Sequence, residues 1–130
     1  MTALTTQELR RLLPDTPPWL KDRLWTLRIL PLKACAGFLA FWRVGRKQMP
    51  VSWWARQAQR KKKPTREVQR LCEAVSREGL SRRGRPNLFI LVRQVKDRWM
   101  VVDGNHRLIG ALIHKPTLVR YVGVWYGVDQ

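Results

Sequence analysis

The run Asp103, Gly104, Asn105, His106 and Arg107 holds the residue types and spacing that suit chemistry best in this sequence. It follows an apolar segment with strand character and precedes a short apolar segment with helical character. Such a glycine turn leaves unpaired backbone N–H groups at the start of the helix, where the helix dipole also favours negative charge. Gly104 can adopt a positive φ angle, and the Arg107 guanidinium can hold two phosphate oxygens. We therefore predict a phosphate-binding turn, with an ordinary strand-to-helix connection as the alternative.

Two side chains of the turn are candidate catalytic groups. Asp103 could bind Mg²⁺ or accept a proton, or it could only cap the following helix. His106 could act as a general base, bind phosphate as a cation, or only pack at the surface. Glu73 and Glu78 could join them, although each has arginine neighbours with which it could form ion pairs. Because acidic residues are scarce, phosphate contact is better supported than catalysis.

The charge of the chain indicates an anionic partner. Its 26 Lys and Arg residues oppose 9 Asp and Glu residues, and the formal net charge is +17. Such a charge attracts polyanions over long distances and through counterion release. We predict a nucleic acid, DNA rather than RNA; an acidic membrane surface and a purely solubilising charge are the alternatives. The predicted nucleic-acid contacts are the basic residues on and around one expected helix: Lys61, Lys62, Lys63, Arg66, Arg70, Arg77, Arg82, Arg83 and Arg85.

Length, cysteine content and hydropathy indicate the size, cellular compartment and metal content to expect. At 130 residues the chain fits a single domain, 1–130. Cys35 and Cys72 stand in apolar sequence without metal-ligand spacing, so we expect buried thiols in a reducing compartment and no metal site. The amino terminus lacks the order of a secretory signal, and the apolar stretch 34–42 is too short to cross a bilayer. We therefore expect a cytoplasmic protein without a membrane span.

Residues 1–60 are expected to form a mainly helical extension. Thr5 and Glu8 have capping-box spacing for a first helix. Ser52 is expected to cap a later helix with Trp53 and Trp54, which could stack on unpaired bases but at this spacing more often fill a core. Between these helices the pattern predicts a helix over 17–26, a short edge strand over 28–32, and a helix or a strand over 34–43.

The second half of the chain has clearer patterns. Thr65 is placed to cap a helix with one apolar face, and Gly79 is placed to end it. A hairpin and a strand–turn–helix–strand unit follow. The predicted elements are a strand over 87–92, a turn at 96–97, a strand over 99–102, a helix over 106–113 and a strand over 118–125.

This order of elements over 65–125 resembles the ParB/sulfiredoxin superfamily. The matching features are the helix ending Glu78-Gly79-Leu80, the strand entered through Pro86, the strand over 99–102, the turn at 103–107 with its helix, and the closing strand. The resemblance implies an α+β fold, with a small mixed sheet and packed helices over 65–126. It also implies that the turn and its helix hold nucleotide phosphates through Gly104, Asn105, His106 and Arg107.

Members of this superfamily include DNA-binding partition proteins, nucleases, small-molecule kinases and sulfinic acid reductases. The reductase cysteine would fall at Asn105, so this activity is not expected here. The 130 residues leave no room for the further domains of partition proteins. Three functions stay open: a DNA-associated protein with nuclease activity as an option, a non-enzymatic plasmid or phage interaction protein, and a small-molecule kinase that uses ATP or CTP with Mg²⁺.

Overall fold

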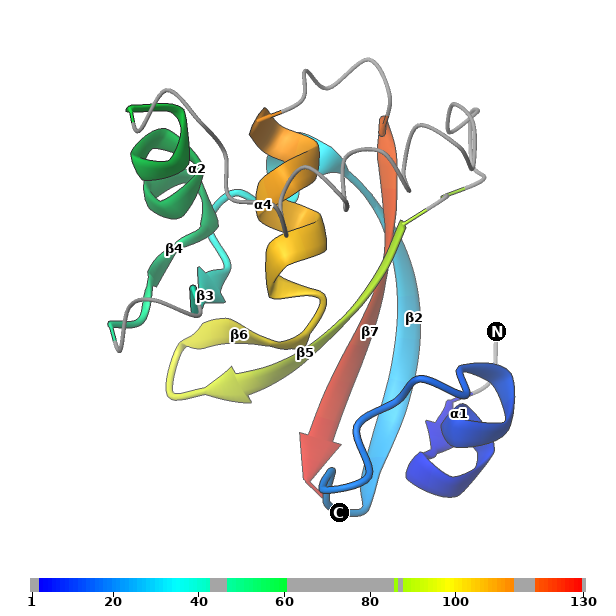
Figure 1. The fold of residues 1–130 in the computed structure, drawn as a ribbon. Coiled ribbons are helices and arrows are strands. Elements are labelled where there is room, and N and C mark those ends of the chain that lie inside the picture. Colours follow the sequence, from blue (N-terminus) through cyan, green and yellow to red (C-terminus); the bar gives the residue numbers. More distant parts are fainter. Residues whose placement is uncertain (1–2, 43–46, 61–85, 87, 114–118, 130) are drawn as a thin grey trace.

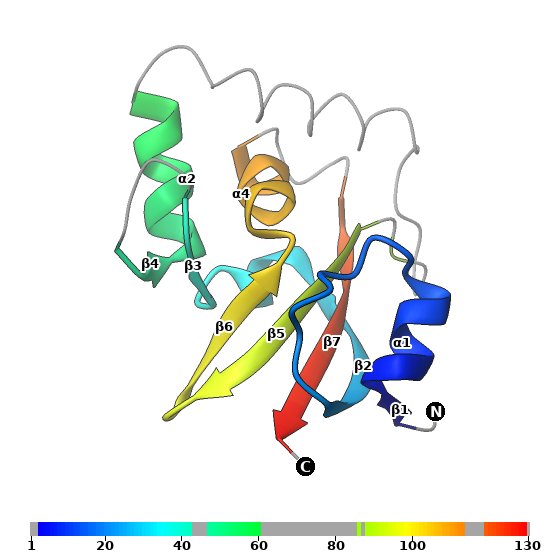
Figure 2. The same cartoon turned by 60° about the horizontal axis from the view of Figure 1, so that its bottom comes forward.

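The computed structural model describes residues 3–42, 47–60, 86, 88–113 and 119–129, which form a mixed α+β structure (Figure 1). The strands of this part of the chain are β1 Leu4–Thr5, β2 Arg23–Pro31, β3 Leu39–Ala40, β4 Met49–Pro50, β5 Leu88–Val95, β6 Arg98–Asp103 and β7 Tyr121–Asp129. These seven strands form one sheet in the order β1-β2-β7-β5-β6-β3-β4. Figure 2 shows β6, β5, β7 and β2 side by side at its centre.

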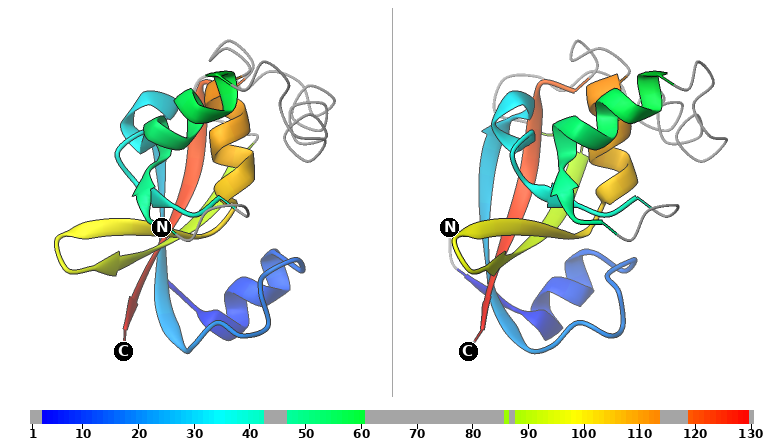
Figure 3. Two further views of the ribbon diagram at one scale, coloured as in Figure 1. Left: turned by 60° about the vertical axis from the view of Figure 1, so that its left-hand side comes forward. Right: turned by 90° about the vertical axis from the view of Figure 1, so that its left-hand side faces the viewer.

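Helices cover both faces of this sheet. The described helices are α1 Thr6–Leu12, the 3-10 helix η1 Leu32–Cys35, α2 Val51–Arg60 and α4 Asn105–Ile113. Along β5, Ile90 and Val92 belong to a core with α2 and α4, whereas Leu91 belongs to a second core with Leu9 of α1. This alternation is that of a strand buried on both sides. In Figure 3 the β5–β6 hairpin lies between α4 above and α1 below.

The first helix is capped as the sequence predicts. The Thr5 hydroxyl accepts a hydrogen bond from the Glu8 backbone N–H at 3.3 Å, and the Glu8 carboxylate accepts one from the Thr5 N–H at 3.4 Å. This reciprocal pair satisfies two donors that a helix start leaves unpaired. The capping box is therefore confirmed.

The hydroxyl of Thr6 links α1 to the start of β2 by hydrogen bonds. The Thr6 Oγ1 accepts hydrogen bonds from the Arg23 N–H at 2.8 Å and from the Trp25 Nε1–H at 3.0 Å. It also donates to the Lys21 carbonyl at 3.0 Å. Thr6 is 1% exposed and Trp25 is 0% exposed, so water cannot replace these partners. The hydroxyl thus fixes where β2 begins beneath the helix.

The predicted helix over 17–26 is wrong. Residues 23–31 instead form β2, which pairs antiparallel with β7 from Arg23↔Asp129 to Pro31↔Tyr121. An ion pair of 2.7 Å between Arg23 and Asp129 joins the ends of the two strands. The partner strand lies about a hundred residues away in sequence, and local patterns carry no information on such a pairing. Residues 1–60 are therefore not a mainly helical extension, because they supply four strands to the shared sheet.

The edge-strand prediction for 28–32 is correct in part. Residues 28–31 form the end of β2, and Leu32 begins η1. Within the described residues, β7 pairs with this end of β2 on one side, and β1 pairs only with Leu24 and Trp25 on the other. Residues 34–43, left open between helix and strand, contain the end of η1 and then β3. Ser52 is not a cap, because α2 already begins at Val51. Trp54 is 7% exposed and donates its Nε1–H to the Ala40 carbonyl, so core packing is its role.

The second half agrees more closely with its patterns. The hairpin of β5 and β6 forms around a turn in which Lys96 has a φ of 56°. The helix predicted over 106–113 is α4, and the last strand begins at Tyr121 rather than at 118. The predicted helix from Thr65 to Gly79 and Cys72 lie outside the described residues.

The strand order determines where the chain runs after β6. β7 is parallel to β5 from Leu88↔Val122 to Arg93↔Gly127, while β6 is antiparallel to β5, so β6 and β7 run in opposite directions on the two sides of β5. The chain that leaves β6 beside Leu91 must therefore pass β5 to reach the start of β7 near Leu88. The helix α4 is part of that connection, and Asp103 to Arg107 is the point at which it starts.

We expect Thr6→Val to lower the free energy of unfolding by about 2–4 kcal/mol, because two buried donors lose their acceptor at almost constant volume. Urea unfolding would measure the change. Thr26→Val makes the same replacement at a partly buried position of β2 and should stay within about 0.5 kcal/mol of the unmodified protein. Equal stability of the two variants would contradict the role assigned to the Thr6 hydroxyl.

We also expect stability to fall in alkaline solution. Burial raises the pKa of the Cys35 thiol from 9.0 to about 12. The unfolded chain therefore loses this proton at a lower pH than the folded protein does. The contribution of this thiol to stability is fully present below pH 9.0 and is lost between pH 9.0 and about 12. Burial and the nearby Cys35 also raise the pKa of Tyr126 above 10.0. Ionisation of this tyrosine therefore lowers the stability of the folded protein further at higher pH. Urea unfolding at several pH values should show a shallower decline for Cys35→Ala.

Candidate functional site

The backbone of the predicted turn forms the start of α4. Gly104 has a φ of +94° and directly precedes α4, and its carbonyl accepts the Leu108 N–H at 2.9 Å. A Cβ added to Gly104 would lie 2.8 Å from Cγ2 of Ile90, which is fully buried. Only glycine therefore suits both the dihedral angle and the space. The N–H groups of the first turn of α4 are those that a helix cannot satisfy internally.

Asp103 and Arg107 face each other across this turn. The Arg107 Nη2 donates to the Asp103 Oδ2 at 3.0 Å, and the two side chains are 37% and 28% exposed respectively. The ion pair occupies one of the five N–H donors of the guanidinium. Arg107 can thus contact an anion with its remaining donors, although the Asp103 carboxylate opposes the approach of that anion.

A small cavity lies beside this ion pair. Its volume is about 100 Å³, well below the roughly 300–1,000 Å³ that is usual for small-molecule sites. It is lined by Leu13, Pro14, Asp15, Thr16, Phe89, Leu91, Asp103 and Arg107. A phosphate-sized group suits this volume, whereas a whole nucleotide does not. This cavity by itself is therefore too small for ATP or CTP.

The other two side chains of the turn contact a different segment. The Asn105 Oδ1 accepts the Phe41 N–H at 3.0 Å, and the His106 ring lies 5.6 Å from the Trp42 ring, centroid to centroid, at 71°. Asn105 thus anchors the chain that leaves β3. The turn therefore divides its side chains between the loop after α1 and the segment after β3.

The structure brings together only part of the predicted site. Asp103 pairs with Arg107 of α4, whereas the His106 ring contacts Trp42 in the segment after β3. Glu73, Glu78 and all nine predicted nucleic-acid contacts lie outside the described residues. Within the described residues no group of three His, Cys, Asp or Glu side chains could hold a metal ion.

Four residues beside the turn were not predicted as part of the site. Asp15 and Thr16 line the cavity, and Phe41 and Trp42 contact Asn105 and His106. They come from segments more than sixty positions earlier in the chain. The only sequence signal was the apolar stretch before residue 43, whose structure the local pattern left open.

Comparisons with known proteins identify no relative: no family model, curated protein or solved structure matches this chain. The resemblance to the ParB/sulfiredoxin superfamily thus stays a prediction. No helix of the described residues is long and apolar enough to cross a membrane.

The anchoring role of Asn105 can be tested by two substitutions. Asn105→Ala removes the acceptor of the Phe41 N–H and should lower the free energy of unfolding by about 1 kcal/mol. Asn105→Asp keeps an oxygen acceptor and adds negative charge at the start of α4, so it should match or exceed the stability of the unmodified protein. Urea unfolding would rank the three proteins. If Asn105→Ala unfolds at the same urea concentration as the unmodified protein, the hydrogen bond with Phe41 does not contribute to stability.

Proposed function

We propose that this protein binds DNA and that the turn at 103–107 contacts phosphate groups of its backbone. The observation that carries the proposal is the start of α4, where Gly104 at φ +94° and the partly exposed Arg107 lie together. Backbone N–H groups at a helix start and a guanidinium are common phosphate ligands. The net charge of +17 supports a polyanionic partner over a single small anion.

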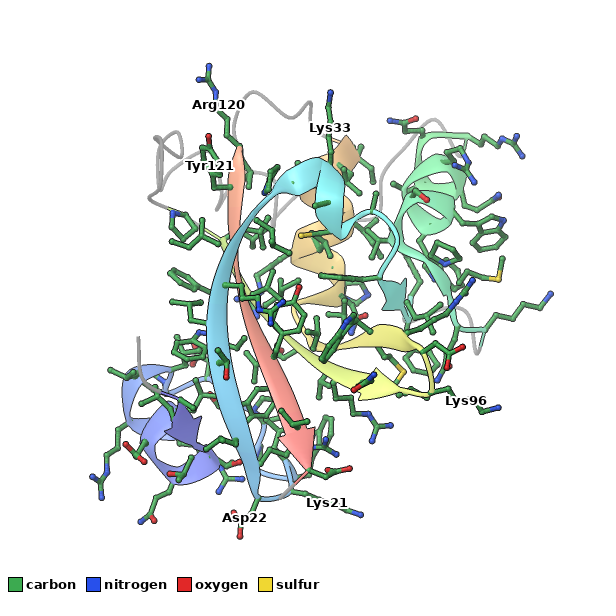
Figure 4. All side chains as sticks on the ribbon, turned by 180° about the vertical axis from the view of Figure 1, so that it is seen from behind. Lys21, Asp22, Lys33, Lys96, Arg120 and Tyr121 are labelled. Atoms are coloured by element: carbon green, nitrogen blue, oxygen red, sulfur yellow. The ribbon has the colours of Figure 1, made fainter. Side chains whose placement is uncertain are left out.

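Positive charge is spread widely over the described surface. In Figure 4 the side chains of Lys33 and Arg120 project from one end of the molecule, Lys21 from the other, and Lys96 from the β5–β6 hairpin. Charge of this distribution attracts DNA without specifying a sequence. The turn would then serve as one fixed contact within a broad electrostatic attraction.

The contacts of Asp103 and His106 favour binding over cleavage. A nuclease needs a carboxylate that is available to a metal ion or a proton, but Asp103 is paired with Arg107 at 3.0 Å. The His106 ring packs against Trp42 and does not line the cavity beside Asp103. Nuclease activity is therefore the less supported form of this proposal.

A non-enzymatic interaction protein is the second candidate function. It is favoured by the fact that side chains of the turn bind other parts of the same chain. Asn105 accepts a hydrogen bond from the Phe41 N–H, and Asp103 forms an ion pair with Arg107. A fold of this kind could act as a scaffold that blocks a protein partner. Affinity capture that yields one stoichiometric protein partner, together with absent DNA binding, would support this candidate over the first.

We expect DNA affinity to fall steeply as salt concentration rises. Arg107→Ala should weaken binding of any duplex about fivefold to tenfold and reduce the slope of log K against log salt by about 1, as loss of one phosphate contact predicts. Fluorescence anisotropy with a labelled duplex at several salt concentrations would measure both quantities.

Two further variants sharpen this test. Arg98→Ala removes the same charge at the opposite end of β6 and should change affinity less than Arg107→Ala. Asp103→Asn removes the carboxylate that opposes an anion and should tighten binding. Binding that is absent, or that does not depend on salt, would contradict the proposal.

A further inference from the structure

Four aromatic rings form a continuous chain from the turn to α2. The His106 ring contacts Trp42 at 5.6 Å, and Trp42 is stacked on Trp54 at 6.4 Å with 30° between the planes. Trp54 in turn contacts Trp53 edge to face at 4.7 Å. All distances join ring centroids. The chain therefore links the start of α4 with the surface of α2, which lies beside α4 (Figure 1).

The two ends of this chain are not buried in the core. Trp54 is 7% exposed and hydrogen-bonded to Ala40, so it serves as the fixed support. Trp42, Trp53 and His106 are each only partly buried. Trp42 and Trp53 pack against the main core and keep part of their surface exposed. Because their neighbours hold these rings in place, much of their conformational entropy has already been lost on folding.

The exposed face of α2 adds positive charge to the aromatic rings. Arg56 and Arg60 follow Trp53 at i+3 and i+7, which places the three side chains on one face of the helix. Both arginines are exposed, whereas Trp54, Ala55 and Ala58 face the core. We call Trp42, Trp53, Arg56 and Arg60 the aromatic–basic strip.

The sequence around this strip contains no acidic residue. Between Asp22 and Glu67 there are twelve Lys and Arg residues and no Asp or Glu. Arg23, one of these residues, pairs with Asp129, whereas Arg56 and Arg60 of the strip are exposed and have no acidic neighbour in the sequence. A chain of phosphates would be attracted throughout, so charge complementarity favours nucleic acid as the occupant.

We propose that the aromatic–basic strip binds unpaired bases, so that the protein prefers single-stranded to double-stranded nucleic acid. This inference rests on the proposed function, because it takes the turn at 103–107 as a phosphate contact. The bases stack on Trp42 and Trp53, and the backbone lies along Arg56 and Arg60. In a duplex the base faces are stacked on one another and cannot reach these rings, whereas those of a single strand can.

Anisotropy titrations with three labelled probes test this inference: an oligodeoxythymidine, its duplex with oligodeoxyadenosine, and a backbone of the same length with abasic sites. The unmodified protein should bind the oligodeoxythymidine most tightly. Trp53→Ala should weaken that binding about tenfold, as loss of one stacked base predicts, and should leave binding of the abasic backbone nearly unchanged. Trp19→Ala is the matched control, since Trp19 is 67% exposed but lies outside the strip.

The double variant Arg56→Glu, Arg60→Glu guards against misfolding of Trp53→Ala, because both arginines are exposed. It should weaken binding of all three probes. If the duplex or the abasic backbone binds as tightly as the oligodeoxythymidine, the preference for unpaired bases is overturned. In that case a loss of duplex binding in Arg107→Ala would still support the proposed function. If none of the three probes binds, both proposals are overturned.

Discussion

The parallel pairing of β5 with β7 is the constraint on which the rest of this structure depends. Two parallel neighbours cannot be joined by a hairpin. The chain instead reverses direction in β6, on the far side of β5, and reaches β7 through α4. This connection buries Leu108 and Ile109 of α4 against the central strands. It also places Gly104 where the backbone turns from sheet to helix, which is why the start of α4 lies at this point of the molecule.

The same central strands divide the protein into two cores. Ile90 faces α4 and touches the place where a Cβ of Gly104 would lie, while Leu91 faces α1 and lines the cavity beside Asp103. The turn thus stands at the junction of both cores. Its side chains follow this division, because Arg107 and Asp103 face the loop after α1 whereas Asn105 and His106 hold the segment after β3.

The contacts of the turn bear on the proposed function. Asp103 pairs with Arg107, and the His106 ring packs against Trp42. Under the proposal of phosphate binding, the backbone N–H groups at the start of α4 and the remaining donors of Arg107 would be the ligands. The net charge of +17 favours a polyanion as the proposed partner.

The sequence by itself determined the local features of this protein. The capping box of Thr5 and Glu8, the β5–β6 hairpin and the glycine turn before α4 depend on residues a few positions apart, and all three formed as predicted. Only the tertiary structure decided the conformation of residues 23–26, which the local pattern assigned to a helix over 17–26 but which form the start of β2 through antiparallel pairing with β7. It likewise decided that the Asn105 side chain accepts a hydrogen bond from the Phe41 N–H, and that Trp54 is buried in the core while Trp53 is only partly buried. The physical reason is the same in each case. Local hydrogen bonds and periodicity depend on neighbouring residues, whereas strand pairing and ring contacts join positions that only the complete fold brings together.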